Sequence, residues 1–534
     1  MSWIKAASLS ALDDGPVVVR QPPRQIAVFK VGDAVFAVDN RCPHEGYPLA
    51  QGSISADCVL TCHWHNWKFR LQDGECILGG DHVRSYGVRI EADDVYVDSS
   101  PPPKDQVEAS IMRGLRAAFD VRDFGRICRE AARLDFEGIP PVNAVRGALE
   151  WAHDRLEFGS THAMAAMTDW LGLPEHWPGD RESRVVCLSE AIDHLAFDSL
   201  RHPSYPFAPA GDRFDPAAFA EAIELEQADR AEGMVRRALD DGLHWADLEE
   251  SFVAAALAHY NAFGHSLIYT FKARQAIPRL GPQSERFLML PLTRHIVYAT
   301  REDQIPEFGI YAEALSRLPE PGGEGGMRPE VPFTATLDEA VRWLERSLAS
   351  FPVEQVYDAL LEALAHSLLH VDIRFDQSSS GPVSQNIGWL DFTHGVTFSN
   401  AVRSMCAVYP AFWRQGLLQM ACFLGRNHSF IDRDLDVSSW RRADQAAFLA
   451  QAREHLLDHG LREPIFAAHH LKNTVAVEDE LRTASESCRQ ALVDSLNRFL
   501  HSPIKMKHVR RNVRQAIALV GRDYAAEAPR AAAL

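Results

Sequence analysis

Cys42-Pro43-His44 and Cys62-His63-Trp64-His65 are the stretches that decide the fold of the N-terminal part of this sequence. Seventeen residues separate His44 from Cys62. Paired Cys and His residues at this spacing offer two thiolates and two imidazoles to a bound metal centre. Gly46 permits a tight turn directly after the first pair. The pattern therefore predicts two metal-binding loops.

Short strands flank both loops. Residues 26–29 and 34–38 predict a hairpin around Gly32-Asp33, a dipeptide that suits a two-residue turn. Further short strands are predicted at 67–71, 85–90 and 95–97, where apolar and polar residues alternate or aromatic and β-branched residues gather. We expect a small antiparallel β domain whose two loops enclose the metal.

The loops and strands together resemble the Rieske family over residues 1–98. The resemblance implies a [2Fe–2S] cluster in which Cys42 and Cys62 bind one iron and His44 and His65 bind the other. Such a cluster transfers single electrons. The alternative is a zinc site with the same four ligands, although structural zinc sites usually use other spacings.

Other positions in the loops indicate the subtype. High-potential Rieske proteins carry a further Cys in each loop, joined as a disulfide, where this sequence has Tyr47 and Trp64. Trp67 stands where those proteins place a Ser that donates to the cluster, so a potential in the lower part of the Rieske range is expected. His63 and Asn66 replace the usual Pro and Gly of the second loop, and Asn tolerates a left-handed backbone.

Composition sets the wider frame. A chain of 534 residues predicts two or three domains, and a net charge of −18 argues against a nucleic-acid partner. The remaining Cys residues are scattered, which suits a reducing cytoplasm. No apolar stretch is long enough to predict a transmembrane helix, and residues 1–5 do not begin a signal peptide. We expect a cytoplasmic protein without a membrane partner.

The chain is predicted to be multidomain, with a small antiparallel β domain at 1–98, a Pro-rich linker at 99–107 and a large, mostly α-helical domain at 108–534. Helical periodicity occurs at 107–134, 143–171, 216–240, 245–277, 335–350, 353–373, 397–424, 440–459 and 479–500. The Gly-rich residues 319–332 either divide the helical domain into halves or form a loop within it.

Histidines in the helical domain suggest a second metal. His366 and His370 are one helical turn apart, and Asp358 and Glu362 continue the same line. The helix is apolar on its other sides, so this polar stripe needs partners. A metal would supply them, and the alternative is an edge that faces solvent.

Other histidines are candidates for the same iron. His394 precedes an apolar run, and Asp391 is near enough in sequence to orient its ring, so both are candidate catalytic residues. His265 begins a segment rich in aromatic residues. One residue of the pair His469-His470 should face inward, because neighbours on a helix diverge by about 100°, and we choose His470. His153 and His162 form a weaker group, and each of these residues has an alternative as a cap or core histidine.

Residues 365–370 and 390–402 look like the questin oxidase-like family. That family is helical and acts on polycyclic aromatic polyketides, and the resemblance implies a mononuclear non-haem iron held by several His residues. In some members a carboxylated Lys completes the ligand set, and Lys472 is the Lys to which this applies here. A Rieske domain in front of the helical domain is not the family's usual arrangement.

These features predict an oxygenase whose cluster delivers electrons to the helical iron, for O₂-dependent oxygenation of an aromatic or polyketide-like small molecule. No dinucleotide-binding motif opens a strand–helix unit, so an external reductase or ferredoxin reductase is expected as electron donor. The alternative is an electron-transfer protein whose helical domain is a docking scaffold without its own metal. A helical dinuclear centre lacks convincing Glu-x-x-His units. The substrate, and whether the protein forms a homo-oligomer, remain open.

Overall fold

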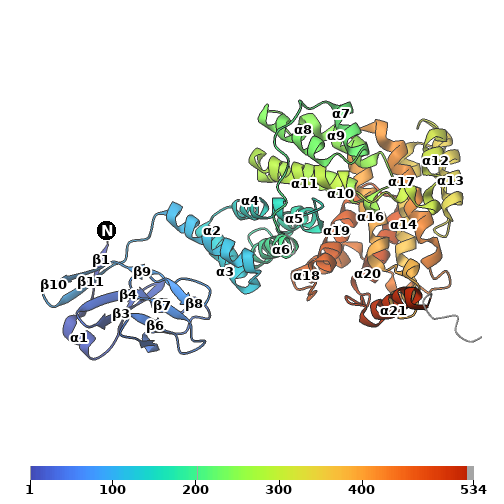
Figure 1. The fold of residues 1–534 in the computed structure, drawn as a ribbon. Helices are drawn as coiled ribbons and strands as arrows, with labels where there is room; N and C mark the ends of the chain where they lie inside the picture. Colours follow the sequence, from blue (N-terminus) through green and yellow to red (C-terminus); the bar gives the residue numbers. More distant parts are fainter. Residues whose placement is uncertain (1, 201–202, 526–534) are drawn as a thin grey trace, which may run out of the picture. The chain divides into compact units, whose positions relative to one another are not determined.

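The computed structural model describes residues 2–200 and 203–525. Its contacts divide the chain into Met1–Pro140 and Pro141–Leu534, and each unit is described by itself below. The first unit contains antiparallel strands and two long helices, and the second is helical (Figure 1). The predicted fold class, a small antiparallel β domain followed by a large helical region, is confirmed. The predicted linker at 99–107 lies within the first unit.

The strands of the first unit form three antiparallel sheets, with the orders β1-β11-β10, β2-β3-β4-β9 and β5-β6-β7-β8. The strands are β1 (Trp3–Ser8), β2 (Val17–Gln21), β3 (Arg24–Val31), β4 (Ala34–Asp39), β5 (Ser53–Ile54), β6 (Val59–Thr61), β7 (Lys68–Arg70), β8 (Cys76–Leu78), β9 (Ser85–Tyr86), β10 (Val88–Glu91) and β11 (Asp94–Asp98). A short helix, α1 (Leu9–Asp13), follows β1. Gly32 has a φ of 60° in the predicted two-residue turn between β3 and β4, and Val31 pairs with Ala34 across it.

Strand β3 separates two apolar cores, because successive side chains on a strand point to opposite faces. Ala27 and Phe29 enter a core that also contains Cys42 and Cys62. Ile26 and Val28 enter another core with residues of β1, β4 and β11. The two cysteines of the predicted metal loops are thus part of a packed interior.

Two helices, α2 (Lys104–Val121) and α3 (Phe124–Glu137), complete the first unit. The 107–134 periodicity predicted one helix, but the chain turns at Arg122, which has a φ of 52°, and Asp123 caps α3. Arg126 and Arg129 of α3 reach the Asp81 carboxylate at 2.9 and 2.7 Å. Arg133 lies 3.1 Å from the same group, whose side chain is 1% exposed. These ion pairs attach α3 to the loop before β9.

We expect Asp81→Asn to weaken this attachment selectively. The change leaves Arg126 and Arg129 without this anion, while Arg133 keeps its pair with Glu130 at 2.8 Å. It should lower the opening free energy of α3 by about 3 kcal/mol, because uncompensated buried charge is costly. Amide hydrogen exchange in α3 measures this. The matched control is Asp73→Asn, which removes a surface pair with Arg70 and should cost less than about 1 kcal/mol. Equal effects of the two changes would contradict the proposed attachment.

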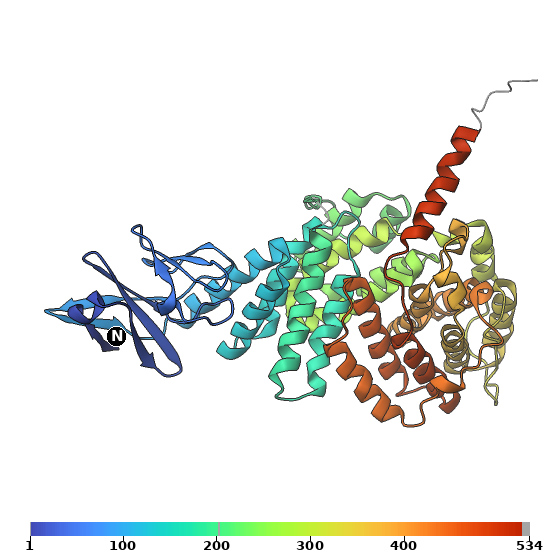
Figure 2. The ribbon, with the colours of Figure 1, turned by 90° about the horizontal axis from the view of Figure 1, so that it is seen from below.

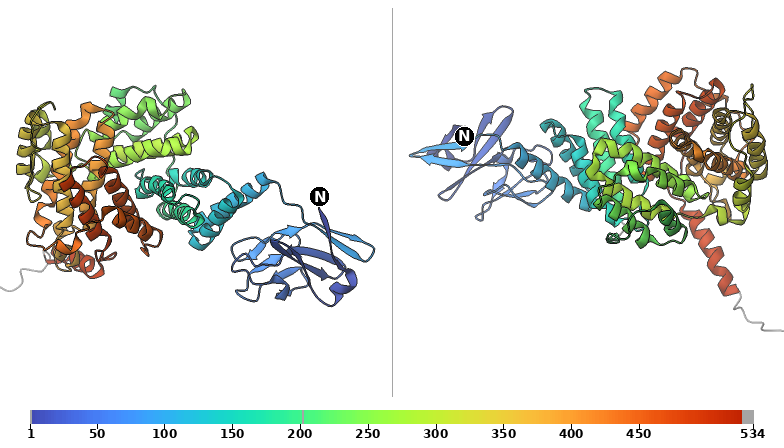
Figure 3. Two further views of the ribbon diagram at one scale, coloured as in Figure 1. Left: turned by 180° about the vertical axis from the view of Figure 1, so that it is seen from behind. Right: turned by 90° about the horizontal axis from the view of Figure 1, so that it is seen from above.

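The second unit is built from helices in antiparallel and crossed packings, which Figures 2 and 3 show from further directions. They are α4 (Pro141–Ala152), α5 (His162–Gly172), α6 (Arg181–Ser199), α7 (Pro216–Glu224), α8 (Ala228–Asp240), α9 (Trp245–Leu257), α10 (His265–Leu280), α11 (Glu285–Val297), α12 (Tyr311–Arg317), α13 (Leu337–Ser350), α14 (Val353–Leu369), α15 (Ile373–Gln377), α16 (Trp389–Cys406), α17 (Trp413–Asn427), α18 (Gln445–Leu457), α19 (Pro464–Glu480), α20 (Glu486–Leu500) and α21 (Val509–Ala525). Within the described residues, no helix is long and apolar enough to cross a membrane.

Four of these helices contact one another in a ring: α5 packs on α10, α10 on α16, α16 on α19, and α19 on α5. Breaks in the helical periodicity place two histidines at helix starts within this ring. The segment predicted at 245–277 breaks where Ala262, Phe263 and Gly264 have positive φ angles, and α10 then begins at His265. The segment predicted at 143–171 is also two helices, because α4 ends at Ala152 and α5 begins at His162.

Candidate metal centres

The two loops of the first unit share one backbone pattern. In each, the cysteine N–H donates to the carbonyl five residues later, and the N–H four residues later donates back to the cysteine carbonyl, at 2.8 to 3.0 Å. Gly46 and Asn66 occupy the equivalent turn positions with φ angles of 78° and 61°. Asn66 thus adopts the left-handed backbone that its residue type tolerates. The loops present their ligands in the same way.

The four predicted donors form two close pairs, one of sulfurs and one of imidazoles. Cys42 and Cys62 are 4% and 1% exposed, and their thiols interact with each other. The Nδ1 atoms of His44 and His65 lie 3.1 Å apart on the outer side. Two buried sulfurs and two imidazole nitrogens at one place fit a cluster that has one iron held by sulfur and one by nitrogen.

Aromatic rings surround these ligands. Trp67 stacks on His44 with ring centroids 4.6 Å apart and an angle of 18° between the planes. Tyr47 and Trp64, which occupy the disulfide positions of the high-potential class, stack on each other at 6.1 Å and 11°. The Trp64 Nε1–H donates to Glu45 at 2.9 Å. An aromatic stack therefore connects the two loops without a covalent bond.

The profile of the Rieske [2Fe-2S] domain family matches residues 2–87. Those residues form a Rieske domain. The 3-phenylpropionate/cinnamic acid dioxygenase ferredoxin subunits of Shigella boydii serotype 4 (strain Sb227) and Escherichia coli (strain K12) are each 27% identical to this chain over 100 residues, which are 18% of the chain and 94% of the relative.

Two solved structures are similar as well. The ferredoxin of carbazole 1,9a-dioxygenase from Nocardioides aromaticivorans IC177 is 25% identical, covers 18% of this chain and 97% of its own, and has a TM-score of 0.18. Dicamba monooxygenase bound to dicamba is 23% identical, covers 19% of this chain and 33% of its own, and also has a TM-score of 0.18. The Rieske domain at residues 2–87 implies a [2Fe–2S] cluster.

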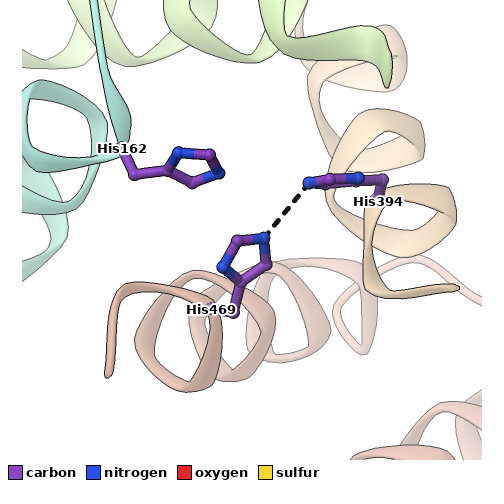
Figure 4. A group of neighbouring side chains, drawn as sticks. All are labelled: His162, His394 and His469. Carbon is purple, nitrogen blue, oxygen red and sulfur yellow. Dashed lines mark hydrogen bonds between the residues drawn. The ribbon is translucent and has the colours of Figure 1, made fainter. Parts of the chain in front are cut away.

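A second group of candidate ligands lies inside the helical unit. His162, His394 and His469 each offer a ring nitrogen, and these atoms all lie within 4.8 Å of one another (Figure 4). The Nε2 atoms of His394 and His469 are 3.1 Å apart. His265 joins the group, because its Nε2 is 3.0 Å from that of His162. One histidine comes from each of α5, α10, α16 and α19.

Hydrogen bonds fix the direction of these rings. The Nδ1–H of His265 donates to the Ala262 carbonyl at 2.5 Å, and that of His469 donates to the Ile465 carbonyl at 2.7 Å. A carbonyl can only accept, so both Nε2 atoms carry lone pairs that point at the centre. This is the arrangement of metal-bound histidines, which usually donate their second N–H to an oxygen.

The surroundings keep the four imidazoles neutral. Burial lowers the pKa of His162, His265, His394 and His469 well below the ordinary value, and the nearby Lys472 ammonium lowers it further. Neutral imidazole is the form that binds a metal, so protons do not compete for this site at neutral pH. The donor set fits a transition metal that takes nitrogen ligands.

Lys472 lies near the four imidazoles. It is three residues after His469 on α19 and therefore shares its face. Its Nζ is buried without a hydrogen-bond partner, and burial lowers its pKa to about 7. The nearby Asp169 carboxylate is bonded to Lys272 instead, at 2.6 Å. A buried amine that is half neutral at pH 7 is an unusual and reactive group.

The structure brings His265, His394 and Lys472 together but places His366 and His370 elsewhere. The Phe333 ring lies against both of these histidines, at 5.7 and 4.5 Å. Asp358 and Glu362, which precede these histidines on the same polar stripe, form ion pairs with Arg328. Phe333 and Arg328 thus supply the partners that the polar stripe needs, and neither histidine belongs to a ligand group among the described residues.

Two further predicted residues have different surroundings. Asp391 accepts from the Gly388 N–H at 2.9 Å and so caps α16, while the His394 Nδ1 has no hydrogen-bond partner. Asp391 therefore does not orient the His394 ring. His470 turns away from the group and packs on Phe499, with ring centroids 4.9 Å apart. Its neighbour His469 belongs to the group instead, and so does His162.

A cavity of about 540 Å³ adjoins the four-histidine group, because His162 lines both. Its lining is mostly apolar and aromatic, with carboxylates and two additional histidines. The lining residues are Leu156, Glu157, Phe158, Gly159, Ser160, Thr161, His162, Ala163, His194, Phe197, Asp198, His295, Leu390, Glu463, Pro464, Ile465, Phe466, Ala468 and Met506. The volume suits an organic molecule of several rings.

The neighbouring residues His469 and His470 provide a sharp test of the group. We expect His469→Gln to lower Co²⁺ affinity of the helical site by at least about tenfold, because one nitrogen ligand is lost. His470→Gln should bind Co²⁺ as the unaltered protein does, and so should His366→Gln. Equilibrium titration of the cobalt absorption bands measures all three. Loss of binding in His366→Gln with retention in His469→Gln would reinstate the ligand set predicted from the sequence.

Proposed function

We propose that this protein is an oxidoreductase in which the Rieske domain passes electrons to an iron held by the helical unit, for O₂-dependent oxidation of a small aromatic or polyketide-like molecule. The observation that carries the proposal is the group of His162, His394 and His469, whose ring nitrogens lie within 4.8 Å of one another beside a cavity, with the His265 Nε2 3.0 Å from that of His162. An electron-transfer domain on the same chain gives such a site a source of electrons.

The relatives support the redox part of the proposal. They are ferredoxin subunits of a dioxygenase that is named for aromatic acids. We propose the same electron-carrying role for residues 2–87, with Cys42 and Cys62 on one iron and His44 and His65 on the other. His65, which is 42% exposed, offers an accessible edge to an external reductase. The resemblance of residues 390–402, which contain His394, to the questin oxidase-like family supports the helical part.

The residues of the helical site have separate tasks. The four imidazoles would hold the iron. Because these ligands are neutral, they would not offset the positive charge of the iron ion. When bound there, iron supplies the capacity to bind and reduce O₂, which organic side chains lack. The apolar wall of the cavity excludes water and holds a flat molecule next to His162. Tyr269, whose hydroxyl is 3.3 Å from the His162 Nδ1, orients that ligand.

Lys472 would complete the ligand set as a carbamate. Its neutral amine would attack CO₂: a C–N bond forms, one C=O π bond opens to a carboxylate, and the nitrogen gives a proton to solvent. Counted from the ammonium form, two protons leave and a buried cation becomes an anion beside four neutral ligands. This change reverses the local charge from one that repels iron to one that attracts it. The unpartnered Nζ and the pKa of about 7 favour the reaction, since only the neutral amine is a nucleophile.

The metal content distinguishes the proposal from a simple carrier. We expect about three irons per chain, two in the cluster and one in the helical site. A His162→Ala and His469→Ala double variant should keep about two irons and the paramagnetic resonance of the reduced cluster. Cys62→Ser should lose the cluster and retain the helical iron. A ratio of about two in the unaltered protein would favour the electron carrier with a helical scaffold.

The carbamate is tested by its dependence on CO₂. Removal of bicarbonate should weaken iron binding at the helical site, and Lys472→Ala should lose it. A small carboxylic acid such as propionate should restore binding to Lys472→Ala, because it returns an anion to the space of the side chain. Labelled bicarbonate and NMR detect the carbamate carbon directly. Iron binding that ignores bicarbonate, with no labelled carbon on the protein, would exclude the modification.

A further inference from the structure

Glu190 on α6 binds two histidines that the iron site does not use. Its Oε2 lies 3.2 Å from the His194 Nε2 and 3.3 Å from the His459 Nε2, and the His194 side chain is 2% exposed. Burial raises the pKa of Glu190, but the hydrogen bonds from both histidines outweigh it and lower the value to about 2. The carboxylate is therefore ionised and accepts an N–H from each ring.

The hydrogen bond to Glu190 determines the protonation state of the other ring nitrogen of His194. Because Nε2–H donates to Glu190, the neutral ring carries its lone pair on Nδ1. That Nδ1 is buried and has no hydrogen-bond partner. His194 also lines the cavity that His162 lines, so a residue of the cavity wall carries this unpartnered nitrogen. A carboxylate behind an imidazole is the arrangement that enzymes use to stabilise a histidine that takes up a proton.

We infer that His194 is a general base that deprotonates the acidic hydroxyl group of a phenol or enol bound in this cavity. The substrate O–H bond breaks, a bond forms between the proton and His194 Nδ1, and the electron pair remains on the substrate oxygen. Glu190 stabilises the resulting imidazolium by its charge. This inference rests on the proposed function and gives it a substrate class, since a phenolate gives up electrons to an oxidant more readily than a phenol does.

The rest of the cavity favours a neutral hydroxyl compound over a carboxylic acid. Carboxyl side chains of Glu157, Asp198 and Glu463 line it, and an anionic substrate would meet repulsion from them. Phe158 and Phe466 provide aromatic surface for a flat ring system. A phenol enters as a neutral molecule and becomes charged only beside His194.

His295 is the competing base in the same wall. Its Nε2 is also buried without a hydrogen-bond partner, and burial lowers its pKa to about 4. A hydrogen bond to the Ser160 backbone fixes its other nitrogen. No carboxylate is bonded to His295 among the described residues, so its cation lacks the stabilisation that Glu190 gives His194. The geometry therefore selects His194.

The probe is 4-nitro-1-naphthol, whose phenolate absorbs at longer wavelength than its neutral form. Full-length protein is titrated anaerobically with the probe at a pH below that of half-ionisation of the free compound. Difference absorbance, with the protein's own colour subtracted, should show the phenolate band on binding. His194→Gln should lose the band, because glutamine can still donate to Glu190 but offers no base. Glu190→Gln should reduce it at least tenfold.

Two variants serve as controls. His459→Gln alters the other histidine on the same carboxylate and should keep the band, and His295→Gln should keep it too. The methyl ether of the probe, which has no proton to lose, should bind all variants with similar affinity and thereby report an intact cavity. Iron content is measured on each sample, so failure of the proposed iron site remains a separate result.

Four outcomes would overturn the assignment of His194. One is a bound probe that stays neutral in the unaltered protein, and another is a phenolate band that survives His194→Gln. The third is loss of the band in His295→Gln with retention in His194→Gln. Absence of saturable binding of both the probe and its methyl ether would equally overturn the assignment, because the cavity would then not accept compounds of this class.

Discussion

The direction of two imidazole rings determines what the helical unit can do. The Ala262 and Ile465 carbonyls take the Nδ1–H groups of His265 and His469, so two Nε2 lone pairs must point into the same buried space. The Nε2 atoms of His162 and His394 lie 3.0 and 3.1 Å from these two atoms, so in the absence of a metal an N–H of each neighbouring ring can donate to the lone pair. Burial and the Lys472 charge oppose protonation of the rings. In the proposed function, a metal ion would replace these N–H groups as the partner of the lone pairs, and a carbamate on Lys472 would remove the positive charge beside it.

The chain uses backbone irregularity to reach this arrangement. Ala262, Phe263 and Gly264 have consecutive positive φ angles, which cost energy for the first two residues. The buried Glu302 compensates in part, since its carboxylate accepts from the Phe263 N–H at 3.3 Å. The turn allows α10 to start at His265 with its ring against His162. A continuous helix through this segment would carry His265 past the group.

The two centres differ in how far a sequence reveals them. The cluster ligands lie in two short loops, and their spacing alone fixes which residues meet. The helical site joins four helices that are distant in sequence, and no local pattern links His162 to His394. The i, i+4 pair His366 and His370 is a stronger local signal, yet Phe333 and Arg328 satisfy that stripe. The position of Lys472 could have corrected the choice of His470 over His469, because Lys472 shares a helix face with His469 rather than with His470.

The two proposals give histidine two uses in this unit, and the hydrogen-bond partner behind each ring distinguishes them. A backbone carbonyl behind His265 or His469 fixes the ring but carries only a partial charge, so the ring stays neutral and suits a metal. The Glu190 carboxylate behind His194 carries a full charge, which stabilises a protonated ring. The first partner leaves the lone pair on Nε2, and the second leaves it on Nδ1. Ligand and base can therefore act beside one cavity without exchanging roles.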